Sequence, residues 1–143
     1  MKKLFLCLFP LLVLGCKSSG LSSQNVSLDY DSFLDHHIEW FEIFNFPMDS
    51  YYIYIYHPSC GHCKDIKDAV LAFAYWHADD FYFVIYSSVI NVITNTETII
   101  GKSNYQEAGI IGTPTLFLIK NHAINSVFTG SKEIIATMYN SIY

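Results

Sequence analysis

Apolar residues recur at helical spacing in the first patterned part of the chain. The segment from Asp29 or Asp31 to about Phe44 has two such lines, and either aspartate is a good helix cap. One line is Leu34, Ile38 and Phe41, and the other is Phe33, Trp40 and Phe44. Pro47 stops the pattern. We predict an α-helix here that packs on two sides.

A strand, a helix and a second strand follow. Tyr51–Tyr56 is an apolar run with the aromatic and β-branched content of a buried strand, so its tyrosines are expected in the core. His57-Pro58 ends the run. A helix is predicted from about Cys60 to His77 by the apolar spacing of Ile66, Ala69, Val70, Phe73 and Ala74. Because Phe81–Tyr86 is the next strand, the two strands should pair in parallel.

The third quarter of the chain has the weakest pattern. Residues 87–101 fit either a strand extension with a loop or a short helix. Ser103 caps a brief predicted helix through Ala108, and Gly109 terminates it.

A hairpin and a helix are predicted at the end of the chain. Leu116–Lys120 and Ala123–Phe128 are short strands joined by the turn Asn121-His122, which favours an antiparallel hairpin. A last helix begins at Gly130 or Ser131, with Ile134, Ile135, Met138 and Ile142 on one side. The predicted order is α-β-α-β-(α)-β-β-α, an α/β protein.

The start of the chain is predicted to be a leader, that is, a secretory signal sequence. Residues 1–15 combine two lysines with an apolar run too short to span a bilayer, as in a secretory signal. Val13-Leu14-Gly15-Cys16 resembles the bacterial lipoprotein processing box, which implies that Cys16 becomes the lipidated first residue. An ordinary signal peptide or an uncleaved anchor is the alternative. Residues 16–27 form a Ser/Gly-rich flexible tether, and 28–143 form the domain.

Length, charge and cysteine count narrow the class of protein. The 143 residues, 52% of them hydrophobic, suit one domain with one core. The chain has no arginine and a net charge of −5, so it is a poor nucleic-acid binder. Cys7 and Cys16 belong to the leader, which leaves Cys60 and Cys63 as the one pair of the domain. Two cysteines are too few for a disulfide scaffold or a four-cysteine zinc site.

The pair Cys60-Gly61-His62-Cys63 lies where the first predicted strand passes into a helix. There the free N–H groups and the helix dipole favour thiolate over thiol at the first cysteine, and a protonated His62 adds to the effect. This arrangement indicates thiol–disulfide exchange. Copper(I) capture by both thiolates with a histidine is the more credible metal alternative, since His57 and His62 flank the pair too tightly for a tetrahedral zinc site. His36 and His37 are adjacent and make a poor metal pair.

Together with Gly112-Thr113-Pro114-Thr115 before the terminal hairpin, this motif resembles the thioredoxin family over roughly residues 27–143. The resemblance implies a thioredoxin-like three-layer α/β/α fold, with a central mixed sheet and a C-terminal antiparallel hairpin and helix. It also implies that Cys60 is the nucleophile, that Cys63 is the resolving thiol, and that Thr113 and a cis Pro114 hold an extended client. Pro58, Gly61 and His62 are expected to modulate the site. The Gly-His dipeptide is similar to that of protein disulfide isomerases.

One position departs from the family pattern. Many members carry a buried acid six residues before the first cysteine, thought to take the proton of the resolving thiol. Tyr54 stands at that position here. Since tyrosine has a reference pKa near ~10, it is a poor proton acceptor at neutral pH. Either water serves instead or resolution is slow.

The sequence therefore predicts a lipid-anchored thiol–disulfide oxidoreductase of the cell envelope that exchanges disulfides with exported proteins. We expect this enzyme to need neither a metal nor a cofactor beyond its redox-active disulfide. We expect it to need a membrane or envelope redox partner. The isomerase resemblance implies a potential nearer ~−180 mV than ~−270 mV, which favours donating or reshuffling disulfides. A copper-binding or metallochaperone lipoprotein, and an envelope lipoprotein that only binds a partner, are the alternatives.

Overall fold

The computed structural model describes residues 27–142, so the predicted leader and Cys16 lie outside the described residues. The described part has four strands, β1 (Ser50–Tyr56), β2 (Phe81–Ile85), β3 (Thr115–Lys120) and β4 (Ala123–Thr129). Its two α-helices are α1 (Gly61–Trp76) and α2 (Gly130–Ile142). It also has four short 3₁₀ helices, η1 (Tyr30–His36), η2 (Trp40–Glu42), η3 (Tyr86–Ser88) and η4 (Thr96–Ile99).

The four strands form one mixed sheet in the order β2-β1-β3-β4. β1 pairs with β2 in parallel and with β3 antiparallel, and β3 pairs antiparallel with β4. The predicted parallel pair and terminal hairpin are therefore confirmed. Asn121 and His122 both have positive φ, of 50° and 58°, as the tight turn of a two-residue hairpin requires.

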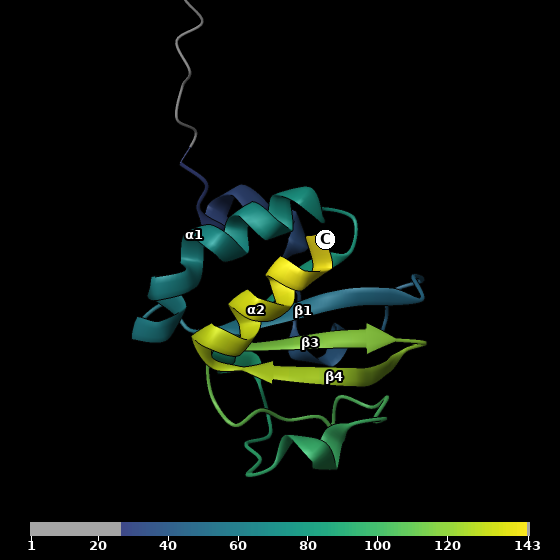
Figure 1. Cartoon of the computed structure of the whole chain (residues 1–143). Coiled ribbons are helices and arrows are strands. Elements are labelled where there is room, and N and C mark those ends of the chain that lie inside the picture. The colour runs from purple at the N-terminus through teal and green to yellow at the C-terminus, as the bar shows by residue number, and fades with distance from the viewer. Residues whose placement is uncertain (1–26, 143) are drawn as a thin grey trace, which may run out of the picture.

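The two faces of the sheet are covered differently (Figure 1). On one face α1 and α2 bury a core with η1, and nine-tenths or more of each of Val70, Phe73, Phe83 and Ile134 is buried there. The opposite face packs against η2 and the chain from η3 to residue 112, with Trp40, Ile99 and Ile110 buried. In the described residues this second layer holds 3₁₀ turns and irregular chain but no α-helix.

The prediction of one α-helix from Asp29 to Phe44 is wrong. Asp29 does cap a helix, through a 2.6 Å bond from the Tyr30 N–H, but this helix is the 3₁₀ helix η1. The chain then leaves helical geometry, because the Ile38 N–H donates to the carbonyl of Phe83 in β2, which is an edge strand of the sheet. Leu34 of the first predicted apolar line is 66% exposed. In the second line Phe33 and Trp40 are buried.

The predicted helix from Ser103 to Ala108 is also absent. The Asn104 carbonyl accepts from the N–H groups of Glu107 and Ala108 in a single turn. Gly109 serves close packing instead of terminating a helix, since a Cβ there would lie 2.7 Å from Cγ2 of Ile93. Backbone hydrogen bonds from the Ile93 N–H to the Ile110 carbonyl and from the Ile110 N–H to the Asn91 carbonyl hold residues 91–93 and 108–110 together there.

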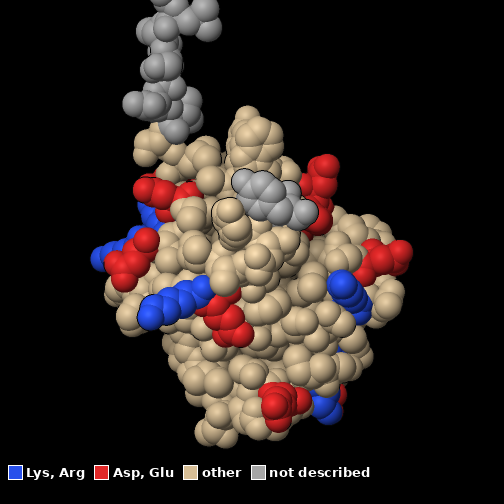
Figure 2. Space-filling view, in the orientation of Figure 1, with Lys and Arg blue, Asp and Glu red and all other residues tan. Residues whose placement is uncertain are grey.

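Three of the four tyrosines of β1 are core residues, as predicted: Tyr51 and Tyr54 are fully buried and Tyr56 is 4% exposed. Tyr52 is only partly buried and packs against the core beside α1 and α2. His37 is also packed, stacked on Phe83 with Nε2 2.9 Å from the Tyr56 hydroxyl. Figure 2 shows charged side chains scattered singly or in small groups over the face of Figure 1. No helix in residues 27–142 has the length and apolarity needed to cross a membrane.

Candidate active site

A tight turn between β1 and α1 presents the first cysteine. The Cys60 N–H donates to the His57 carbonyl over 3.0 Å, with Pro58 at the second position of the turn, where its fixed φ is favourable. The Ser59 N–H donates to Nδ1 of His57 over 3.1 Å. The backbone of Cys60 is extended, at φ −77° and ψ 121°, and α1 begins at the next residue. Cys60 is thus the N-cap of α1.

The sulfur of Cys60 replaces the usual oxygen of a helix cap. The Cys63 N–H donates to Cys60 Sγ over 3.2 Å. Partial burial by itself raises the pKa of the Cys60 thiol. Hydrogen bonds from the side chains of Cys63 and Thr113 and from the backbone N–H groups of Cys63 and His62 outweigh it, so the pKa lies below its ordinary value. The first turn of α1 therefore favours the thiolate.

Cys63 lies one helical turn further and is only 2% exposed. Burial first, and then its hydrogen bond with Cys60, raise the pKa of the Cys63 thiol to about 11. Both cysteines are in the reduced form in this structure. The pair consists of one partly exposed sulfur that ionises easily and one buried sulfur that keeps its proton.

Thr113 and Pro114 lie beside the pair although they are far from it in sequence. The Cys60 thiol donates to the Thr113 carbonyl over 3.4 Å. The Thr113–Pro114 peptide bond is cis, which is the geometry that the resemblance implied. The Gly130 N–H donates to the Pro114 carbonyl over 3.0 Å, which ties this loop to the start of α2.

His62 contributes a backbone N–H to Cys60, and its ring lies at the surface. The side chain is 78% exposed, and its Nδ1 lies 3.8 Å from the Asp65 carboxylate. Its backbone N–H is one of the donors that lower the pKa of Cys60. The His62 carbonyl accepts from the Ser131 hydroxyl over 3.1 Å, so the residue also joins α1 to α2. A Cβ on Gly61 would meet nothing within 4 Å, so close packing does not require glycine there.

Residues 27–142 contain no group of three His, Cys, Asp or Glu side chains arranged to hold a metal ion. The Nδ1 atom of His57 is engaged with the Ser59 N–H. The described residues therefore offer the two sulfurs of the pair without a third ligand for copper(I).

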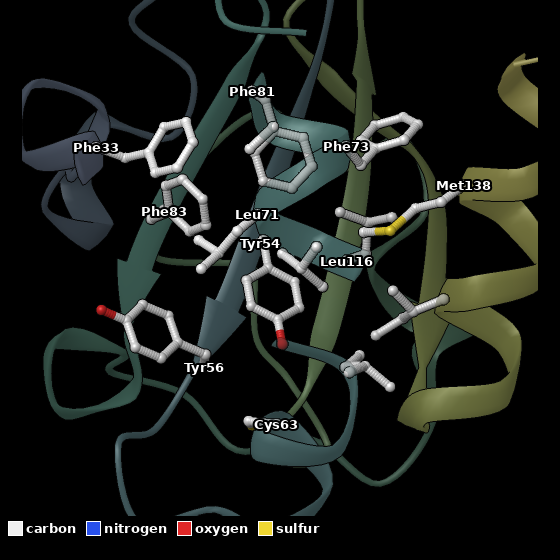
Figure 3. Packing of buried hydrophobic residues seen from close by; sticks show 14 residues of the cluster. Phe33, Tyr54, Tyr56, Cys63, Leu71, Phe73, Phe81, Phe83, Leu116 and Met138 are labelled. Atoms are coloured by element: carbon white, nitrogen blue, oxygen red, sulfur yellow. The ribbon is translucent and has the colours of Figure 1, made fainter. Parts of the chain in front are cut away.

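Two tyrosine hydroxyls lie behind the buried cysteine. Tyr54, from β1, points its hydroxyl toward the start of α1, where Cys63 lies (Figure 3). Tyr30, from η1, lines a pocket together with Cys63. Tyr54 stood out in the sequence as a departure from the family pattern, but Tyr30 was missed. No sequence signal marks Tyr30, since only the tertiary fold brings η1 against the first turn of α1.

No family model and no curated protein matches the chain. Among solved structures, it is similar to mitochondrial thioredoxin 3 from Saccharomyces cerevisiae in its oxidized form, with TM-score 0.54 and 15% identity over 78% of this chain and 96% of that chain. It is also similar to thioredoxin NaTrxh from Nicotiana alata, with TM-score 0.52 and 19% identity over 75% of this chain and 90% of that chain. The chain therefore has the thioredoxin fold, with the Cys60/Cys63 pair at the start of its first α-helix.

Proposed function

We propose that this chain of thioredoxin fold is a thiol–disulfide oxidoreductase. The observation that carries the proposal is the capping of α1 by a sulfur: the Cys63 N–H donates to Cys60 Sγ, and the pKa of Cys60 is lowered while that of Cys63 is raised. A two-step exchange needs one thiol that ionises readily and attacks first, and a second thiol that stays protonated until the mixed disulfide has formed. The two cysteines, one helical turn apart, have pKa values shifted in these two directions.

The reaction follows from these two sulfurs. The Cys60 thiolate attacks one sulfur of a client disulfide, so a mixed disulfide forms and the other client sulfur leaves as a thiolate. Cys63 then loses its proton and attacks Cys60 Sγ. The bond between Cys60 and the client breaks, and the second client thiolate leaves. The client gains two electrons and the pair loses two. The reverse sequence oxidises a client dithiol.

Thr113 and Pro114 are the proposed client-binding residues. In the structure the Thr113 carbonyl accepts from the Cys60 thiol, so it loses this donor when Cys60 ionises. A free backbone carbonyl beside the nucleophile is suited to pair with an extended client segment, as in strand addition. Ile111, two residues earlier, is 48% exposed and offers the same segment an apolar contact.

The cell envelope is the proposed location, with exported thiol or disulfide proteins as clients and a membrane or envelope redox partner. The support is the sequence of residues 1–16: a charged start, a short apolar run and a lipoprotein-like box ending at Cys16. Lipid on Cys16 would tether the domain to a membrane through residues 17–27. An oxidising compartment is also where disulfide exchange with folding clients is required.

Disulfide donation or isomerisation is the proposed direction. Hydrogen bonds that stabilise the Cys60 thiolate stabilise the reduced pair, and a stabilised reduced form makes a couple more oxidising. We therefore expect the Cys60/Cys63 couple to titrate nearer ~−180 mV than ~−270 mV.

Equilibration of the purified protein in glutathione buffers, followed by alkylation and mass analysis, measures this potential. A value below about −250 mV would reverse the proposed direction in favour of a reductase. A pair that forms no reversible disulfide at any buffer ratio would contradict the proposed activity itself.

A further inference from the structure

A pocket of about 240 Å³ lies on the buried side of the cysteine pair. Cys63, Tyr30, His57 and Pro58 line it, and its rim carries Asp29, Lys64 and Lys67. Lys67 Nζ lies 2.7 Å from the Asp29 carboxylate and 5.2 Å from the centre of the Tyr30 ring, so this ion pair forms part of the pocket wall. A pocket of this size, with the charged groups of Asp29, Lys64 and Lys67 in its lining, has room for several water molecules, each taking about 30 Å³ in the liquid. Solvent thus has a path to a sulfur whose side chain is otherwise buried.

The hydroxyls of Tyr54 and Tyr30 are both buried and interact with each other, but neither has a partner of good hydrogen-bond geometry in the described residues. Such groups are rare in folded proteins, since an unpaired buried hydroxyl costs free energy. Burial raises the pKa of both tyrosines far above the ordinary value, so both hydroxyls stay protonated and can donate a hydrogen bond. Tyr54 and Cys63 belong to the same packed cluster, and each of the two hydroxyls interacts electrostatically with Cys63.

We propose that Cys63 loses its proton to solvent through this pocket, and that the hydroxyl of Tyr54, assisted by that of Tyr30, donates the hydrogen bond that stabilises the Cys63 thiolate. The inference rests on the proposed function, since only disulfide exchange requires Cys63 to ionise. A tyrosine at this position thus acts as a donor to the thiolate, where a carboxylate would act as a proton acceptor.

The step balances without a further reactant. The S–H bond of Cys63 breaks and its proton passes to pocket water and then to bulk solvent. The sulfur lone pair forms the bond to Cys60 Sγ, and the bond between Cys60 and the client breaks. The client thiolate that leaves takes a proton from solvent, so no net proton is consumed.

Titratable groups face Cys63 from every element around it. They are Tyr54 and Tyr56 of β1, His57 of the turn, Cys60 at the cap, Lys64 and Lys67 of α1, and Asp29 and Tyr30 at η1. Of these, only the hydroxyls of Tyr54 and Tyr30 are buried without a partner of good hydrogen-bond geometry within residues 27–141, and the two interact with each other. The Tyr56 hydroxyl already bonds His37 Nε2, which makes Tyr56 a matched control two residues along the same strand.

The aromatic disulfide of Ellman's reagent separates the two steps in one assay. In a background with Cys7 and Cys16 replaced by serine, the first thionitrobenzoate released reports attack by Cys60, and the second reports attack by Cys63. We expect Tyr54→Phe to slow the second release about tenfold at neutral pH, the value of one hydrogen bond to a charged group, and to shift its pH profile to higher pH. The first release should change little. Tyr56→Phe should leave both releases near the original rates.

Tyr54→Phe removes a buried hydroxyl that has no well-formed hydrogen bond, so the urea midpoint of unfolding should change little. A slowed second release in a variant of undiminished stability supports the proton-path role. A second release that is unchanged in Tyr54→Phe would overturn it while leaving the proposed function intact. If the original protein releases the first equivalent no faster than a free cysteine does, both proposals fail.

Discussion

Replacement of Cys60 by serine is expected to lower the rate of disulfide exchange at least about a thousandfold, because it removes the one nucleophile that the site presents. Serine is itself a favourable N-cap, so its hydroxyl can accept from the Cys63 N–H as Cys60 Sγ does. The fold should therefore persist while the chemistry is lost. Reduction of a fluorescent disulfide peptide by the purified protein measures the rate.

Ser59→Ala is the matched control for this experiment. Ser59 is exposed and contributes its backbone N–H to the turn, which alanine retains. It should leave the exchange rate close to that of the original protein. A Cys60→Ser variant that keeps most of its rate would show that Cys60 is not the nucleophile and would favour a protein that only binds a partner.

Replacement of Cys63 by alanine is expected to trap clients on Cys60. The attack of Cys63 is intramolecular and gains from the effective concentration of a thiol fixed one helical turn away, so its loss should prolong the mixed disulfide at least about a hundredfold. Covalent adducts that dithiothreitol releases should accumulate on non-reducing gels, and mass spectrometry of the released proteins identifies the clients.

The double variant Cys60→Ser/Cys63→Ala is the control for trapping, since it lacks both sulfurs and should carry no adduct. Clients drawn from exported proteins would support the envelope assignment. A folded, expressed Cys63→Ala variant without adducts would count against the enzyme, whereas stoichiometric copper(I) on the original pair would favour the metal-binding alternative.

The sequence predicted the elements whose hydrophobic periodicity and end signals lie within the element itself. The strand β1, the helix α1 and the hairpin β3–β4 have clear periodicity and clear ends, and each lies within a few residues of its predicted place. The predicted α-helix from Asp29 to Phe44 was wrong, although its apolar residues fit two helical lines. The Ile38 N–H pairs with Phe83 of β2, and no local pattern reveals a bond across 45 residues of sequence. The same holds for residues 87–112, where Ile99 and Ile110 are buried by tertiary contacts alone.

The sequence predicted which residues form the candidate site, but it did not predict how all of their side chains are oriented and packed. The Cys-Gly-His-Cys motif at a strand end and the distant Thr-Pro pointed to Cys60, Cys63 and Thr113, and the structure brings these three together. The sequence cannot show that the His62 ring faces solvent or that Tyr30 lines the pocket at Cys63, because both depend on how α2 and η1 pack against α1.

The ionisation of Cys60 in the original protein tests the central claim most directly. Iodoacetamide reacts with the thiolate, and Cys63 is buried with its pKa raised to about 11, so alkylation at Cys60 can be followed by peptide mass spectrometry as a function of pH. The rate should reach half its plateau at a pH clearly below the ~8.5 of a free cysteine, because the cap of α1 stabilises the thiolate. A midpoint at or above ~8.5 would contradict the account.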